Sequence, residues 1–167
     1  VRLRQEWGRN FQRNLFVFFQ IQALAALFLA ALFIPVYQDP RPLSGGFEIL
    51  GVAIFLFGFA GVTLADSQLN RFKADPANHG KVCQLGLWNY SRHPNYFFES
   101  LLWVGWATFA TASPAGCWAW LAPLTILWLV LKVTGIPPTE EQSLRSKGDA
   151  YREYQRTTSS FVPWFKR

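Results

Sequence analysis

The sequence has little charge, only two cysteines and no methionine. Lys, Arg, Asp and Glu together make up 16% of its 167 residues. Cys83 and Cys117 belong to no Cys-x-x-Cys pair or Cys/His cluster, so neither a zinc site nor a disulfide framework is expected. We expect both cysteines to be structural, because a free cysteine packs like a small apolar residue. Since the chain begins at Val1 and lacks methionine, we also expect that a preceding part of the protein is missing from it.

Apolar residues dominate the chain and occur in long blocks. Hydrophobic residues account for 51% and aromatic residues for 17% of the sequence. A helix needs a run of roughly 18 or more apolar residues to cross a bilayer. Four blocks qualify as spans, at residues 15–37, 47–65, 96–112 and 117–133. The sequence therefore predicts an all-α integral membrane protein. We expect residues 1–167 to form a single membrane domain with about four transmembrane helices plus a C-terminal amphipathic helix, as the C-terminal part of a longer multi-pass protein.

The distribution of Lys and Arg predicts the orientation of these spans, because cytoplasmic loops accumulate basic residues. The loop after the first span contains only Arg41, and the loop after the third contains none. The basic residues that flank the other ends of the spans are Arg2, Arg4, Arg9, Arg13, Arg71, Lys73, Lys81, Arg92, Arg145, Lys147, Arg152, Arg156, Lys166 and Arg167. We expect the N-terminus, middle loop and tail to face the cytoplasm, in a bacterial inner membrane. Topology and contact with membrane lipids then account for the net charge of +6, and no nucleic-acid partner is expected.

Two polar patches lie between the second and third spans. In the first, Asp66, Asn70 and Lys73 are spaced by four and three residues and so share one helical face. A snorkelling helix end is the structural alternative for Lys73. The second patch covers residues 87–96, where Arg92 can grip a phosphate and Pro94 favours the start of a helix.

Glu99 lies one helical turn after Asn95, inside the apolar third span. An ionisable residue within a span indicates a functional site. The alternative is a structural pairing of Glu99 with Arg92 or His93.

A third polar patch covers residues 140–154, after a helix-start signal at Pro137, Pro138 and Thr139. Spacings of four, three, four and three residues place one stripe on a single helical face: Glu140, Leu144, Lys147, Tyr151 and Tyr154. The alternative interpretation is an amphipathic helix on the membrane surface, with Trp164 and Phe165 as interfacial anchors.

These motifs taken together resemble a known family. The segment 87–96 followed by Glu99, the acidic pair Glu140-Glu141, Lys147-Gly148 and the ending Phe161-Val162-Pro163 resemble the C-terminal half of the steroid 5-alpha-reductase superfamily, in particular its bacterial branch of uncharacterised membrane proteins. The resemblance implies an NADPH-dependent oxidoreductase acting on CH-CH groups, like 3-oxo-5-alpha-steroid 4-dehydrogenase. Such an enzyme reduces a carbon-carbon double bond conjugated to a carbonyl in a steroid-like or lipid substrate.

The resemblance also implies which residues bind the cofactor, NADPH. They are Asp66, Lys73, Tyr90, Arg92, His93, Asn95, Tyr96, Glu99, Glu141, Lys147, Tyr151 and Tyr154. The catalytic residues that polarise the substrate are expected in the N-terminal half, which is missing from this chain. No G-x-G-x-x-G follows a strand, so a Rossmann domain is excluded and the cofactor pocket must lie between helices.

Two alternative functions remain open. The related isoprenylcysteine carboxyl methyltransferases share the Arg-His-Pro-x-Tyr segment and the tail acids, which allows an S-adenosylmethionine-dependent membrane methyltransferase. Because NADPH is strongly anionic, Lys73, Arg92, Arg145 and Lys147 favour the reductase. The second alternative is a non-enzymatic lipid-binding or assembly protein, which should bind no nucleotide.

Overall fold

The computed structural model describes residue 4, residues 7–40 and residues 45–166. Arg2, Arg41 and Arg167, which contribute to the predicted orientation, lie outside the described residues. The helices are η1 Gly8–Asn10, α2 Phe11–Ala31, α3 Ile34–Tyr37, α4 Gly46–Ala74, η2 Pro76–Asn78, η3 Gly86–Asn89, α5 Pro94–Ala110, η4 Gly116–Trp120, α6 Leu121–Trp128, the π-helical η5 Leu129–Val133, α7 Ile136–Lys147 and α8 Asp149–Thr157. Within the described ranges there is no strand, only an isolated bridge between Ser91 and Ser159. The predicted all-α class is confirmed.

Three helical stretches are long and apolar enough to cross a membrane: Gly8–Ala31, Gly46–Ala74 and Gly116–Lys147. They confirm the prediction of an integral membrane protein. The other expected span corresponds to α5, which has 17 residues. This length is at the lower limit of roughly 17–25 residues for a transmembrane helix, so a fourth span stays a prediction.

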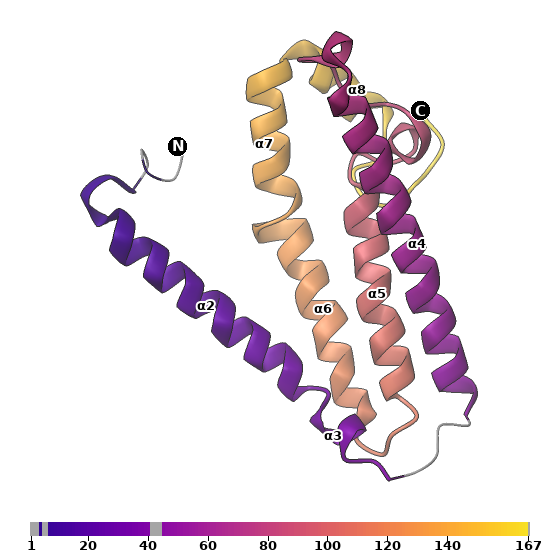
Figure 1. Cartoon of the computed structure of the whole chain (residues 1–167). Coiled ribbons are helices and arrows are strands. Elements are labelled where there is room, and N and C mark those ends of the chain that lie inside the picture. The colour runs from indigo at the N-terminus through magenta and orange to yellow at the C-terminus, as the bar shows by residue number, and fades with distance from the viewer. Residues whose placement is uncertain (1–3, 5–6, 41–44, 167) are drawn as a thin grey trace.

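Glycines bring α4 and α5 into close contact. A Cβ atom added at Gly51 would lie 2.7 Å from the carbonyl oxygen of Gly105, and one at Gly58 would lie 2.9 Å from the carbonyl oxygen of Phe98. At Gly61 it would lie 2.2 Å from the ring of Phe98. Small residues at such positions let membrane helices approach closely, and the two helices lie side by side in Figure 1. We call this contact the glycine seam.

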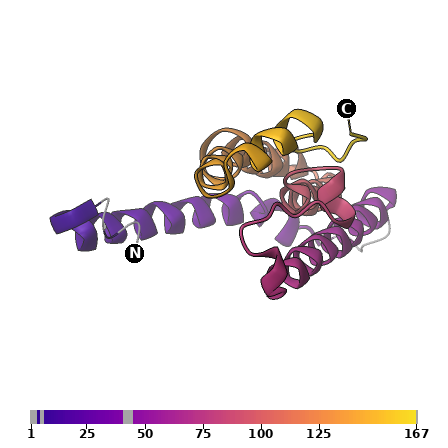
Figure 2. The ribbon, with the colours of Figure 1, turned by 90° about the horizontal axis from the view of Figure 1, so that it is seen from above.

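The polar segments gather at one end of the helices. Residues 75–93, α7 and α8 lie at the upper end in Figure 1, and the N-terminal end of α2 lies at a similar level. We call the region formed by residues 75–93, α7 and α8 the polar end. The start of α2, the middle loop and the tail therefore lie toward the same end of the fold, in agreement with the distribution of basic residues. Figure 2 shows α2 reaching away from the other helices, and none of its apolar window is buried.

The tail forms two helices where the sequence predicted one. Helix α7 ends at Lys147 and α8 begins at Asp149, with Gly148 between them at φ 53° and ψ −127°. Residues other than glycine rarely adopt a positive φ. Because glycine has no Cβ, the chain can bend at this position at little steric cost. The bend retains the predicted common orientation of Lys147, Tyr151 and Tyr154, whose side chains line one cavity.

Candidate functional site

The loop before α5 is fixed to α4 by two hydrogen bonds. The indole Nε1 of Trp88 donates to the carbonyl oxygen of Ala65 at 2.9 Å, and the backbone amide of Leu87 donates to Oε1 of Gln68 at the same distance. Trp88 is buried, so this attachment has little competition from water. The loop is thereby held above the glycine seam, at the end where α5 begins.

The first turn of α5 joins two of the predicted polar patches. Pro94 occupies the start of the helix, as its sequence predicted. The side-chain Nδ2 of Asn95 donates to Oδ1 of Asp66 at 3.2 Å, while its Oδ1 accepts from the amide of Tyr96 at 3.0 Å. Glu99, one turn further along, is exposed and interacts electrostatically with Asp66. Asp66, Asn95 and Glu99 therefore form one group across α4 and α5.

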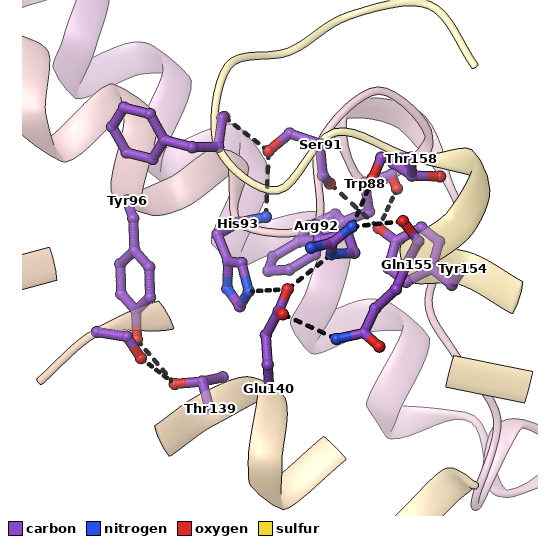
Figure 3. Close-up of polar contacts among 12 residues, drawn as sticks. Trp88, Ser91, Arg92, His93, Tyr96, Thr139, Glu140, Tyr154, Gln155 and Thr158 are labelled. Carbon is purple, nitrogen blue, oxygen red and sulfur yellow. Dashed lines mark hydrogen bonds and ion pairs between the residues drawn. The ribbon is translucent and has the colours of Figure 1, made fainter. Parts of the chain in front are cut away.

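A charged cluster centred on Glu140 joins the loop before α5 to α7 and α8 (Figure 3). Oε1 of Glu140 accepts from Nε of Arg92 at 2.7 Å and lies 3.3 Å from Nε2 of His93. Oε2 accepts from Nε2 of Gln155 at 2.8 Å. The side chains of Arg92 and Glu140 are only 10% and 16% exposed, so the pair is largely shielded from water. We refer to these four residues as the Glu140 cluster.

Arg92 also binds the segment that follows α8. Its Nη1 donates to the carbonyl oxygens of Gln155 at 2.8 Å and Thr158 at 2.7 Å, and its backbone amide donates to the carbonyl of Ser159 at 2.8 Å. Two of its guanidinium nitrogens are therefore engaged within the protein. The structure gives Arg92 a tethering role, which leaves less of its donor capacity for the phosphate predicted from the sequence.

Two tyrosines of α8 are buried and uncharged. The hydroxyl of Tyr154 lies between the carbonyls of Trp88 and Ser91, to which it can donate. Burial raises the pKa of Tyr154 well above its usual value, and burial with the nearby charge of Glu140 raises the pKa of Tyr151 to about 12. Both hydroxyls remain protonated donors at neutral pH.

A cavity of about 240 Å³ lies between the ends of α4 and α5 and the α7–α8 segment. We call it the polar cavity. Eight of the twelve predicted cofactor residues line it: Lys73, Arg92, His93, Asn95, Tyr96, Lys147, Tyr151 and Tyr154. Three basic side chains and no acidic side chain belong to its described lining, which favours an anionic occupant. Residues from three separate patches of the sequence thus meet in one place.

The other four predicted residues lie outside the lining of the polar cavity. Asp66 accepts a hydrogen bond from Asn95, and Glu99 is exposed. Tyr90 is exposed, and its ring packs edge-on against Phe165. Glu141 is also exposed, and its Oε1 accepts from Nη2 of Arg145 at 2.5 Å.

Of the two tail acids, Glu140 faces the site and Glu141 faces away. The helical spacing from Glu140 to Lys147, Tyr151 and Tyr154 was the signal in the sequence that could have identified Glu140 as a site residue.

Cys83 was also missed as a lining residue, although it is buried as expected of a structural cysteine. Burial raises the pKa of its thiol. Among the described residues, no group of three or more His, Cys, Asp or Glu side chains could hold a metal ion.

The fold and the polar cavity define an all-helical membrane protein with a polar site at one end of its helices. The chain matches the model of the family described as "Protein of unknown function (DUF1295)" over residues 1–158, and it belongs to this family. The family includes steroid 5-alpha-reductase-like proteins.

A curated relative is the "Uncharacterized protein C594.04c" of Schizosaccharomyces pombe. It is 27% identical over 171 residues, which cover 89% of this chain and 49% of the relative. The chain thus spans about half the length of that relative. No solved structure matches the chain.

Proposed function

We propose that this chain is the cofactor-binding part of an NADPH-dependent membrane reductase. Its substrate would be steroid-like or another lipid that carries a carbon-carbon double bond conjugated to a carbonyl. The observation that carries the proposal is the convergence of eight predicted residues on one cavity with basic but no acidic lining side chains. The finer resemblance to the steroid 5-alpha-reductase superfamily supports the same function.

The residues of the polar cavity fit an anionic dinucleotide in their chemistry. Lys73 and Lys147 line it from the ends of α4 and α7, and neither forms an ion pair with a described residue. They would bind phosphate groups, because Arg92 is largely engaged with Glu140 and backbone carbonyls. Asn95 and Tyr96 offer amide and hydroxyl groups that can orient a carboxamide.

The size of the polar cavity fits one end of such a cofactor. Its volume of about 240 Å³ is below the ~300–1,000 Å³ that is usual for ligand pockets. A second hollow of about 500 Å³ is lined by Arg92 and by residues of the segment after α8. Arg92 lines both spaces.

When bound, a reduced nicotinamide cofactor supplies a hydride to the substrate's double bond. The residues described here bind the cofactor, fix its orientation and exclude water from around it. Lys73 and Lys147 would neutralise the phosphates, while the buried Tyr151 and Tyr154 would provide rigid walls. We place the substrate-polarising residues outside this set, in the N-terminal part of the whole protein.

The membrane arrangement follows from the same proposal. With α5 as a fourth span and the polar end facing the cytoplasm, the cofactor enters from the soluble nucleotide pool. The apolar substrate enters from the bilayer, where membrane lipids surround the exposed apolar side chains of α2 and α4. We propose a bacterial inner membrane as the location.

A second candidate is an S-adenosylmethionine-dependent methyltransferase. The observation that favours it is the aromatic lining by Trp88, Tyr96, Tyr151 and Tyr154, because aromatic faces attract cations such as a sulfonium. Against it, Lys73 and Lys147 repel a cationic group, and no described acidic side chain lines the cavity. The reductase is therefore the better supported of the two.

Ligand-dependent stability of the full protein in detergent tests the proposal. We expect NADPH, and not S-adenosylmethionine, to raise the midpoint of thermal unfolding. Lys147→Gln should weaken NADPH affinity about tenfold, by loss of one charged phosphate contact. Lys81→Gln removes an exposed lysine outside the cavity lining and should leave the affinity unchanged. Stabilisation by S-adenosylmethionine alone would instead identify the methyltransferase, and a response to neither would favour a non-enzymatic lipid-binding or assembly protein.

A further inference from the structure

The wall of the polar cavity formed by α7 and α8 is attached to the loop before α5 through the side chains of Glu140, Tyr154 and Arg92. The two helices pack mainly against η5 and against each other, rather than along α4 or α5. Their connection at Gly148 is exposed, and no atom lies within 4 Å of the position of a Cβ there. This wall therefore depends on particular side-chain contacts for its position.

Glu140 makes contacts on both sides of that wall. Its Oε1 faces Arg92 and His93 at the start of α5, and its Oε2 accepts from Gln155 of α8. Arg92 also binds the carbonyls of residues 155 and 158, so Glu140 contacts the same guanidinium group that binds the end of α8. Figure 3 shows Glu140 between these partners.

We propose that Glu140 is a positioning residue whose carboxylate holds the α7–α8 segment closed over the polar cavity. The identity of the enclosed ligand rests on the proposed function, but the closure itself does not. Hydrogen bonds to a charged, shielded carboxylate are stronger than neutral ones, so a single residue can control this local opening. Glu141 does not hold the segment closed, because its exposed carboxylate pairs with Arg145 on the same helix.

Cys83 offers a direct measurement of the closure. Its side chain lines the polar cavity and is 6% exposed, whereas Cys117 is exposed. The charges that act on the Cys83 thiol are those of Lys147 and Lys73. Loss of the Glu140 charge should therefore change access of a reagent to this thiol rather than its ionisation.

The test compares maleimide labelling of Glu140→Gln, Glu141→Gln and the unmodified full protein in detergent, without nucleotide. We expect Glu140→Gln to raise the labelling rate of Cys83, relative to Cys117, by about tenfold through loss of a charge-assisted contact. Glu141→Gln should leave this ratio unchanged. Equal ratios in all three proteins, or an equal increase in both variants, would contradict the proposal.

A second variant separates closure from general unfolding. Gln155→Ala removes only the side-chain bond from α8 to Oε2 of Glu140, so it should raise the Cys83 ratio by a smaller factor. The helix content and thermal midpoint of that variant should match those of the unmodified protein. If Glu140→Gln unfolds, an unchanged ratio in Gln155→Ala overturns the proposal.

Repetition with NADPH separates this inference from the proposed function. A raised ratio in Glu140→Gln that NADPH lowers supports both closure and cofactor binding. A raised ratio that NADPH does not affect supports closure by Glu140 and counts against NADPH as the occupant. A normal ratio together with NADPH binding supports the cofactor and overturns the positioning role of Glu140.

Discussion

The glycine seam and the Glu140 cluster hold neighbouring helices together by different means. In the seam, Gly51, Gly58 and Gly105 bring the backbones of α4 and α5 close together without charged groups. In the cluster, the ion pair between Glu140 and Arg92 connects α7 to the loop before α5. The seam joins two apolar helices, whereas the cluster lies at the polar end.

The difference follows from the surroundings of each region. Apolar helices in a bilayer gain little from hiding apolar surface, so close packing of small residues stabilises their association. The segment beyond the apolar helices can use charges, provided that each shielded charge has a partner. Added side-chain volume should therefore destabilise the glycine seam, whereas a change of charge should have little effect on it. In the Glu140 cluster, loss of a charge should destabilise the protein more than a change of volume.

Arg92→Met should produce the largest loss of stability. It leaves the shielded Glu140 carboxylate without its main partner and frees the carbonyls of residues 155 and 158. Loss of one member of a buried ion pair costs about 3–5 kcal/mol, and we expect about 3 kcal/mol because the pair is slightly exposed. Unfolding of the variant by denaturant in mixed micelles measures the change.

Arg145→Met is the matched control for this loss. It removes an exposed ion pair with Glu141 on α7 and should cost about 0.5 kcal/mol or less. Similar losses in the two variants would show that the Glu140 cluster has no special energetic weight.

Gly105→Val should weaken the glycine seam by about 2–3 kcal/mol, the upper part of the usual cost of overpacking. A Cβ at this position would lie 2.7 Å from the backbone nitrogen of Phe55 and 2.8 Å from the carbonyl oxygen of Gly51, so α4 and α5 must separate. Gly46→Val is the control, because no atom lies within 4 Å there. A thermal midpoint that is lowered equally in both variants would argue against close packing as the cause.

The membrane class and the helical ranges could be predicted because they depend on local composition. The expected span 47–65 lies within α4, and the span 117–133 covers most of η4, α6 and η5. The apolar content of residues 96–112 did not decide whether α5 is long enough to cross a bilayer. The break at Gly148 was also missed. Lys147, Tyr151 and Tyr154 keep a helical spacing across the glycine, so the sequence predicted one continuous helix.

The candidate site could be predicted in part, because helical spacing indicates which residues share a face. The family resemblance, rather than spacing, assigned residues of separate helices to one site, and Lys73, Asn95 and Lys147 do line one cavity. Spacing does not show which partner a charged group selects. Arg92 is bonded to Glu140 and to backbone carbonyls, so its side chain is not free in the cavity. These partners depend on how α8 packs, which the sequence pattern does not show.

Burial of Tyr151 should make the polar end sensitive to alkaline pH. Because its pKa rises from about 10 to about 12 on folding, the unfolded state loses the phenol proton first. The contribution to stability is fully present below pH 10 and is lost as the pH rises from about 10 to 12. The stability difference between the unmodified protein and Tyr151→Phe should therefore shift by about 2.7 kcal/mol across this range. A constant difference would show that Tyr151 titrates normally in the folded protein.

Gly148→Ala should have the smallest effect and tests whether the bend between α7 and α8 is separate from both contacts. At φ 53° an alanine is strained even though its Cβ meets no neighbour, so the expected loss is about 1 kcal/mol. Gly46→Ala adds the same methyl group at a position without positive φ and should be nearly neutral. Because the bend lies between Lys147 and Tyr151, the labelling ratio of Cys83 should rise along with the loss of stability. A loss without any change in labelling would mean that the Glu140 cluster keeps the cavity closed whatever the conformation at Gly148.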